Sequence, residues 1–129
     1  MTYVATKRFD GREDTPQVCM ARVQGVGGTN ITQASITSIT CKVFDLSGAT
    51  PDTAETTPTV TVATSVFDTL QTDDMWDEDT VGYNFRFTVP AASFSTGDHY
   101  YLIEFTFTPT SGDAYTSTFE VYAAPLRSS

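Results

Sequence analysis

Residues 71–85, QTDDMWDEDTVGYNF, bring together the side chains with the clearest chemical potential in this chain of 129 residues. Carboxylate oxygens are ligands that calcium prefers in proteins. The candidate calcium ligands in this stretch are Asp73, Asp74, Asp77 and Asp79. The EF-hand order is not met, because Gly82 comes too late in the stretch and no glutamate follows at the required distance. The stretch is therefore either a weak calcium site or, more simply, a solvated acidic loop.

The only tryptophan of the chain, Trp76, lies in the middle of the same stretch and shortly before Tyr83. Together the two rings could form an aromatic platform for a sugar, so Trp76 and Tyr83 are the candidate ligand platform. In the simpler interpretation, Trp76 folds back over the core and pins the loop, and its indole N–H donates to a backbone carbonyl. We favour the second interpretation.

Side chains for catalysis are few. The chain has one histidine, His99, which follows Asp98, and no G-x-S-x-G motif presents a serine nucleophile. We interpret His99 as an exposed polar residue at a strand end. Carboxylates are plentiful, but no spacing selects the two that a glycosidase needs. The sequence therefore predicts a protein that is not an enzyme and that uses no cofactor.

The two cysteines, Cys19 and Cys41, have no C-x-x-C spacing and no neighbouring histidine, which argues against a zinc site. Each lies in a strand-like run, where a buried thiol behaves as a small apolar side chain. A disulfide between them is the alternative if the two runs pair side by side. Reduced thiols are the expectation, because the first residues contain no secretory signal peptide and indicate a cytosolic protein.

Charge divides the chain into two parts. Residues 1–44 carry five basic side chains against three carboxylates, whereas residues 45–120 carry thirteen carboxylates against Arg86 alone. An acidic body repels phosphate backbones, and no apolar run is long enough to span a membrane. We therefore expect neither nucleic acid nor a membrane as partner. The basic N-terminal segment could dock an acidic neighbour, including a second copy of the chain.

Alternating apolar and polar residues predict strands along most of the chain, most clearly over residues 82–90, 99–109 and 114–123. In each run the alternate residues are expected to face the core. They are Tyr83, Phe85, Phe87 and Val89, then Tyr101, Ile103, Phe105 and Phe107, and finally Tyr115, Ser117, Phe119, Val121 and Ala123. The turn PTSGD at residues 109–113 makes the last two runs antiparallel neighbours.

The N-terminal half is less regular. Residues 16–25 predict a strand, and residues 31–45 predict a long strand with a β-bulge or bend near Thr37 and Ser38, where its apolar phase changes. Residues 46–58 predict a long acidic loop. Residues 59–70 predict a strand that starts at Val60 and closes in a helical turn.

These six or seven short strands predict an all-β fold, a single immunoglobulin-like antiparallel β-sandwich of about seven strands with Greek-key connections. We expect an N-terminal arm over residues 1–14, the sandwich over 15–124 and a C-terminal tail over 125–129. In immunoglobulin-like sandwiches a tyrosine near the start of the penultimate strand bonds back to the preceding corner. Tyr101 is the candidate, and the alternative is that it is only an aromatic residue at the edge of the core.

Three blocks of the sequence carry a resemblance to a known group of proteins. They are EDTPQVCMARVQGVGGTNITQASITSITCKVFD, DTLQTDDMWDEDTVGYNFRFTVPAASF and GDHYYLIEFTFTPTSG. Their hydrophobic phasing and turn placement resemble the small immunoglobulin-like proteins encoded among the virion genes of tailed bacteriophages. The resemblance spans about residues 13 to 122 and contains no catalytic signature.

The resemblance implies a non-enzymatic structural protein of the virion that is made in the host cytoplasm. It implies a capsid decoration, a neck or collar component, or a tail or baseplate module. Its partners would be other virion proteins of the capsid, neck or tail, in a homo-oligomer or multi-copy assembly. The alternative hypothesis is a ligand-binding or adhesion module that recognises glycans, with calcium as a possible requirement.

A structural protein of this kind acts through its surfaces, and the unpaired groups of an edge strand can continue a sheet into a partner. We expect the interface on the first strand, residues 15–24, and on the segment before it. The candidate assembly residues are basic or apolar. They are Lys7, Arg8, Arg12, Val18, Met20 and Arg22.

Overall fold

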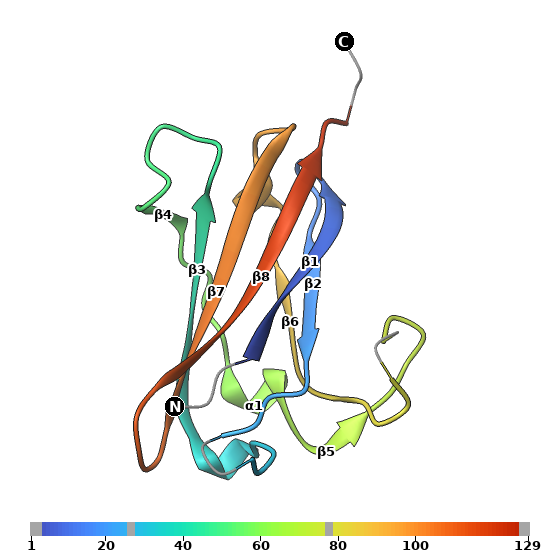
Figure 1. The fold of residues 1–129 in the computed structure, drawn as a ribbon, viewed down its shortest axis with the longest axis vertical. Helices are drawn as coiled ribbons and strands as arrows, with labels where there is room; N and C mark the ends of the chain where they lie inside the picture. Colours follow the sequence, from blue (N-terminus) through green and yellow to red (C-terminus); the bar gives the residue numbers. More distant parts are fainter. Residues whose placement is uncertain (1–3, 26–27, 77–78, 127–129) are drawn as a thin grey trace.

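The computed structural model describes residues 4–25, 28–76 and 79–126, whose strands form two sheets packed as a sandwich (Figure 1). The larger sheet has the order β1-β8-β7-β3-β4, with bounds Val4–Arg12, Tyr115–Ala124, His99–Pro109, Ile36–Asp45 and Ala54–Thr56. The smaller sheet has the order β2-β6-β5, with bounds Gln17–Ala21, Tyr83–Val89 and Val66–Gln71. The predicted all-β sandwich is confirmed.

The strand order is that of an immunoglobulin-like domain. In that fold the third, sixth and seventh strands (C, F and G) share one sheet, and the second, fourth and fifth (B, D and E) share the other. Here β3, β7 and β8 are neighbours in the larger sheet, and β2, β6 and β5 form the smaller sheet. The described part of the chain has eight strands, because short β4 and the N-terminal β1 each add an edge to the larger sheet.

Strand β1 departs from the expectation of an arm over residues 1–14. Val4–Arg12 pairs in parallel with β8, with Lys7 opposite Phe119 and Arg12 opposite Ala124. The sandwich is therefore not antiparallel throughout. The reason is tertiary: β8 would otherwise be an open edge with unpaired N–H and C=O groups, and β1 covers it.

The core lies between the two sheets and follows the predicted alternation. Each inward residue predicted in the last two runs is buried: Tyr101, Ile103, Phe105, Phe107, Tyr115, Ser117, Phe119, Val121 and Ala123. Phe85 meets Phe105 and Phe107 edge-on, with ring centroids 4.8 and 5.1 Å apart. Such geometry lets large aromatic side chains fill the space between sheets at close packing.

The irregular parts were predicted in part. The register of β3 against β7 shifts between Ile36 and Ser38, which confirms the β-bulge. A 3-10 turn, Gln33–Ser35, precedes β3, and another, Ala91–Phe94, precedes β7. The loop predicted over residues 46–58 contains β4.

The predicted order of elements over residues 59–70 is wrong. The helical turn comes first, as α1 (Val62–Ser65), and the strand β5 follows it. At this point the chain crosses from the larger sheet to the smaller one, and the turn lets Val66 enter the core opposite Phe85. The chain must turn here to reach the smaller sheet, and this tertiary constraint overrides the local preference of β-branched residues for a strand.

Tyr101 forms the predicted corner. Its hydroxyl accepts a hydrogen bond from the Thr96 N–H (3.0 Å) and donates one to the Thr96 carbonyl (3.2 Å). Asp98 has a positive φ of 61°, which turns the chain into β7. The corner therefore ties the start of β7 to the segment that precedes it.

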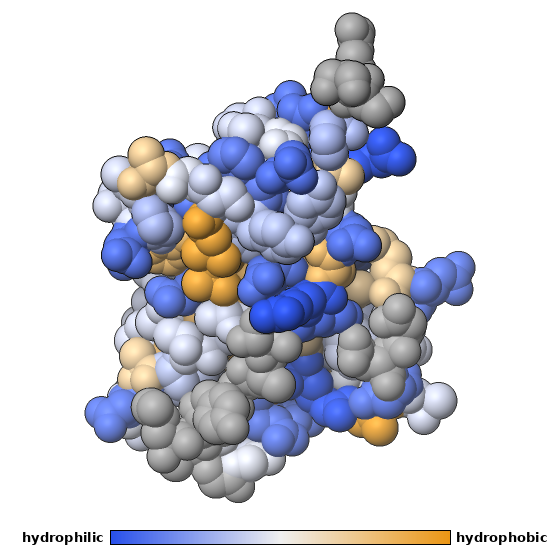
Figure 2. All heavy atoms as spheres, turned by 45° about the horizontal axis from the view of Figure 1, so that its top comes forward, coloured by the Kyte–Doolittle hydropathy of each residue, from blue (hydrophilic) through white to orange (hydrophobic). Residues whose placement is uncertain are grey.

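The face seen in Figure 2 is mostly hydrophilic, and its apolar side chains form separate groups. No helix among the described residues is long and apolar enough to cross a membrane.

Candidate functional site

The edges of the two sheets meet on one side of the sandwich, where β1 and β2 lie close together (Figure 1). A hollow of about 350 Å³ lies between them. It is lined by Lys7, Arg8, Phe9, Val18, Met20, Met75 and Phe119. Four of the six predicted assembly residues thus lie around one hollow, which we call the edge hollow.

Lys7 links the edge hollow to the acidic loop. Its ammonium nitrogen lies 5.7 Å from the centroid of the Trp76 ring, within the range of a cation–π contact. Met75, the neighbour of Trp76, is half exposed and forms part of the wall of the hollow. The loop between β5 and β6 therefore lies beside the edge strands.

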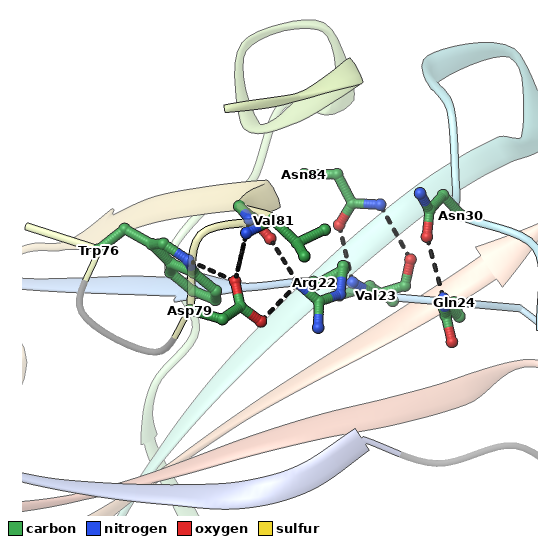
Figure 3. A network of polar contacts seen from close by, with 9 residues as sticks. Arg22, Val23, Gln24, Asn30, Trp76, Asp79, Val81 and Asn84 are labelled. Atoms are coloured by element: carbon green, nitrogen blue, oxygen red, sulfur yellow. Dashed lines mark hydrogen bonds and ion pairs between the residues drawn. The ribbon is translucent and has the colours of Figure 1, made fainter. Parts of the chain in front are cut away.

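The other two predicted assembly residues lie elsewhere. Arg12 is exposed at the end of β1, opposite Ala124. Arg22 follows β2 and binds within the chain: its guanidinium lies 2.8 Å from the Asp79 carboxylate and donates to the Gly82 carbonyl (3.1 Å; Figure 3). Arg22 is therefore part of the internal structure of the loop.

Asp79 organises the loop through both of its oxygens (Figure 3). Its Oδ1 accepts hydrogen bonds from the indole N–H of Trp76 (3.1 Å) and from the backbone N–H groups of Val81 and Gly82 (3.0 Å each), and its Oδ2 faces Arg22. The hydrogen bond from Gly82, followed by the contacts of Arg22 and Trp76, lowers the pKa of this carboxyl well below its usual range. Asp79 therefore acts as an acceptor for its own loop.

Gly82 is required at the end of this loop. Its φ is +110°, and a Cβ at this position would lie 2.3 Å from the carbonyl oxygen of Gln71. Only glycine fits so close an approach in this part of φ space.

The candidate platform is not a flat pair of exposed rings. Trp76 and Tyr83 are in contact, with centroids 5.6 Å apart and planes tilted by 48°, but Tyr83 is only 4% exposed. The Tyr83 hydroxyl donates to Asp73 (2.7 Å), and this bond lowers the pKa of Asp73. The expectation that the indole N–H finds a backbone carbonyl is wrong, because the side chain of Asp79 lies within reach.

The candidate calcium ligands are largely engaged or apart. Asp73 and Asp79 accept hydrogen bonds from the loop, Asp74 is exposed, and Asp77 lies outside the described residues. Among the described residues, no group of three or more potential ligand side chains could hold a metal ion.

A buried amide near the loop had no signal in the sequence. Asn84 is 1% exposed; its side chain accepts from the Val23 N–H (2.7 Å) and donates to the Val23 carbonyl (3.0 Å; Figure 3). Just beyond the end of β2 it replaces a backbone acceptor for the Val23 N–H, while the Val23 carbonyl also accepts from the Ile31 N–H (3.1 Å). The alternation of β6 suggested an outward residue here, and only the strand register reveals the bond.

His99 is not exposed as we expected. It is half-buried, and its Nδ1 lies 2.8 and 3.0 Å from the two carboxylate oxygens of Asp45 on the neighbouring strand β3. Among the described residues, Asp45 is the one side chain that hydrogen-bonds this ring. The pair joins two strands and presents no nucleophile.

Cys19 and Cys41 are buried free thiols. Burial raises the pKa of Cys41 to about 12 and also raises that of Cys19, because the thiolate loses its hydration. Both side chains therefore act as apolar core residues.

A larger hollow, of about 570 Å³, lies at the end of the sandwich where the β2–β3 and β7–β8 connections meet. Its described lining is formed by Gly25, Thr29, Asn30, Ile31, Ser35 and residues 109–115. No residue type in these loops predicted it, because small and polar residues are also what turns require.

Comparisons with protein-family models, curated proteins and solved structures found no match.

Proposed function

We propose that this chain is a non-enzymatic structural protein of a tailed-phage virion and acts by docking to neighbouring proteins. The observation that carries the proposal is the edge hollow, around which Lys7, Arg8, Val18 and Met20 gather. Apolar walls with cations at the rim suit a partner segment that carries apolar and acidic side chains.

The edge strands supply the second element of a docking surface. Among the described strands, β1 pairs only with β8, and β2 pairs only with β6. The other side of each strand meets no described strand, so an extended segment can add to the sheet there. The hollow and the two free edges thus form one continuous surface.

Charge favours a second copy of the chain as the occupant. The N-terminal part up to residue 44 has an excess of basic residues, and residues 45–120 contain thirteen carboxylates. Opposite charges on different parts of one chain favour contact between copies, as a multi-copy assembly requires. In the particle, proteins of the capsid, neck or tail would be the further neighbours.

The virion role rests on the resemblance of the chain to immunoglobulin-like virion proteins, and it has a direct test. Purified particles of the source virus are digested and analysed by mass spectrometry. Peptides of this chain are the expected result. Their absence from intact particles would remove the virion role.

The docking surface has a separate test by multi-angle light scattering on the full chain. We expect the wild type to self-associate, and Arg8→Glu and Val18→Glu to shift it to monomer. Lys42→Glu is the matched control for Arg8→Glu, because it makes the same change of charge at an exposed position of β3. A monomeric wild type contradicts the second-copy partner, and equal association of all variants contradicts the edge hollow as the interface.

Point variants are preferred to deletion of residues 1–12. Deletion removes β1 and uncovers the edge of β8. Loss of assembly would then not distinguish a lost interface from a damaged sheet. Circular dichroism of each point variant verifies that it remains folded.

A further inference from the structure

Two tyrosines lie side by side on the outer face of the larger sheet, away from the core. Tyr100 of β7 and Tyr122 of β8 are directly opposite in register, and their ring centroids are 5.0 Å apart with planes tilted by 48°. Their chain neighbours Tyr101 and Val121 are buried, so alternation turns the two tyrosines outward. Tyr100 is 49% exposed.

The position of Tyr122 is fixed by a strong hydrogen bond. Its hydroxyl donates to Asp98 Oδ1 at 2.6 Å, in the turn that precedes β7. Bonds to a carboxylate are shorter and stronger than neutral ones. The Tyr122 ring, which contacts Tyr100, is thus held in place in the absence of any ligand.

Charged side chains border the two rings. Asp10 lies opposite Tyr122 in register, and Arg8 lies opposite Glu120 in the next row. Together with the rings they surround a shallow hollow of about 250 Å³, lined by Arg8, Phe9, Asp10, Tyr100, Glu120 and Tyr122. We call this set the tyrosine shelf.

The polar groups of the shelf keep capacity for a ligand. Arg8 Nε lies 3.6 Å from Glu120 Oε2, an ion pair longer than a hydrogen bond. No described residue donates a hydrogen bond to the Asp10 carboxylate. In this the shelf differs from the acidic loop, where Asp73 and Asp79 already accept bonds from the chain.

Exposed aromatic faces beside free acceptors and a guanidinium match the chemistry of a sugar ring. The C–H groups of a pyranose can pack on the face of Tyr100, while its hydroxyls donate to Asp10 and Glu120 and accept from Arg8. Sites for small ligands typically combine an aromatic wall with a small number of polar groups that point at the ligand. The net charge of −9 disfavours anionic polymers.

We propose that the tyrosine shelf, on the outer face of the larger sheet, binds a neutral sugar ring. This site is separate from the Trp76 and Tyr83 pair, in which Tyr83 is buried. Arg8 and Phe9 line both hollows, but the two rings that would hold the sugar, Tyr100 and Tyr122, do not line the edge hollow, so the proposal does not depend on the docking role.

The test is an NMR titration of the full chain with glucose, galactose and N-acetylglucosamine, after a neutral glycan array has ranked larger ligands. We expect amide shifts at Tyr100, Glu120 and Tyr122. Tyr100→Ala should weaken binding by about tenfold, because it removes the stacking face, whereas Tyr100→Phe should keep most of it. Leu126→Ala, which removes another half-exposed apolar side chain, should leave binding unchanged.

Three results would overturn the proposal. The first is that no sugar or glycan shifts the shelf amides. The second is that binding survives Tyr100→Ala and is lost in Trp76→Ala, which would place the site on the acidic loop. The third is that tetramethylammonium shifts the same amides and sugars do not, which would make the shelf a cation site.

Discussion

Arg22 holds Asp79 at 2.8 Å and also donates to the carbonyl of Gly82, sixty residues further along the chain. The contact joins the end of β2 to the loop that precedes β6. Both side chains are about one-third exposed (31% and 32%), so solvent weakens the ion pair itself. Its main effect is to position the loop.

Asp79 should make stability depend on acid pH. Its pKa is lowered in the folded state, so the folded chain binds fewer protons than the unfolded chain. Its contribution is complete above the unfolded pKa of about 3.9 and is lost as the pH falls towards the folded pKa. We expect the Tm difference between wild type and Asp79→Asn to shrink from about pH 6 to about pH 2. Asp113→Asn, at an exposed loop position, is the control, and a constant difference would contradict the linkage.

Gly82→Ala should destabilise the fold. The added Cβ meets the Gln71 carbonyl at a φ of +110°, and strain of this kind lowers the free energy of unfolding by about 1–3 kcal/mol. Gly112→Ala is the matched control, because Gly112 has a φ of +96° but no atom within 4 Å of its added Cβ. In urea unfolding, Gly82→Ala should have a lower free energy of unfolding than Gly112→Ala. Equal losses would show that φ alone matters.

Tyr101→Phe should lower the free energy of unfolding by about 1 kcal/mol, because it removes both hydrogen bonds to Thr96. The exposed position of Thr96 lets water replace part of the loss. Tyr100→Phe removes a hydroxyl from the preceding residue and should leave the free energy of unfolding unchanged. If both variants have the same urea midpoint as the wild type, the hydrogen bonds of the corner do not contribute to stability.

Two buried polar side chains should respond in opposite directions. Asn84→Ala leaves the N–H of Val23 without a partner, whereas the Val23 carbonyl keeps the hydrogen bond from the Ile31 N–H, so the variant should destabilise the protein by about 1–3 kcal/mol. The hydroxyl of Ser117 is buried and has no hydrogen-bond partner among the described residues, so Ser117→Ala should be neutral or stabilising. Thermal unfolding checks both, and a stabilised Asn84→Ala would contradict the role of the amide.

The thiols should be unreactive until the protein unfolds. With a pKa of about 12, only about 10⁻⁴ of Cys41 is thiolate at pH 8, and Cys19 is buried as well. Mass spectrometry after iodoacetamide treatment should find no label on the native protein and two labels after unfolding without reductant. Absence of label after unfolding would reveal a disulfide.

The parts of the fold that could be predicted are those with local signals. Strands β6, β7 and β8 have alternating sequences because each buries one face, and the inward residues of β7 and β8 follow directly. The phase change before Ile39 likewise revealed the bulge in β3. Strand β1 had no such signal: of Lys7–Arg12, only Phe9 is a large apolar residue, and the strand forms because β8 offers it an edge.

The candidate sites were predicted less well than the core. Four of six assembly residues do lie around one hollow. Arg22, by contrast, binds Asp79, and Tyr83 is buried in contact with Trp76 instead of forming an exposed platform with it. The tyrosine shelf was not predicted: the pairing of β7 with β8 was expected, but neither the register that places Tyr100 opposite Tyr122 nor the strand β1 that adds Arg8 and Asp10 was.

The sequence by itself determined the all-β class and the inward faces of the regular strands, because burial of one face requires a period of two residues. Only the tertiary structure decided which strands are edges and which polar groups stay available to a partner. Asp79 and Asp10 have the same side chain, but Asp79 accepts hydrogen bonds from its own loop and faces Arg22, whereas no described residue donates a hydrogen bond to Asp10. The contact of Arg22 with Asp79 and the position of Asp10 beside β8 each join segments far apart in the chain, and only the folded structure brings such segments together.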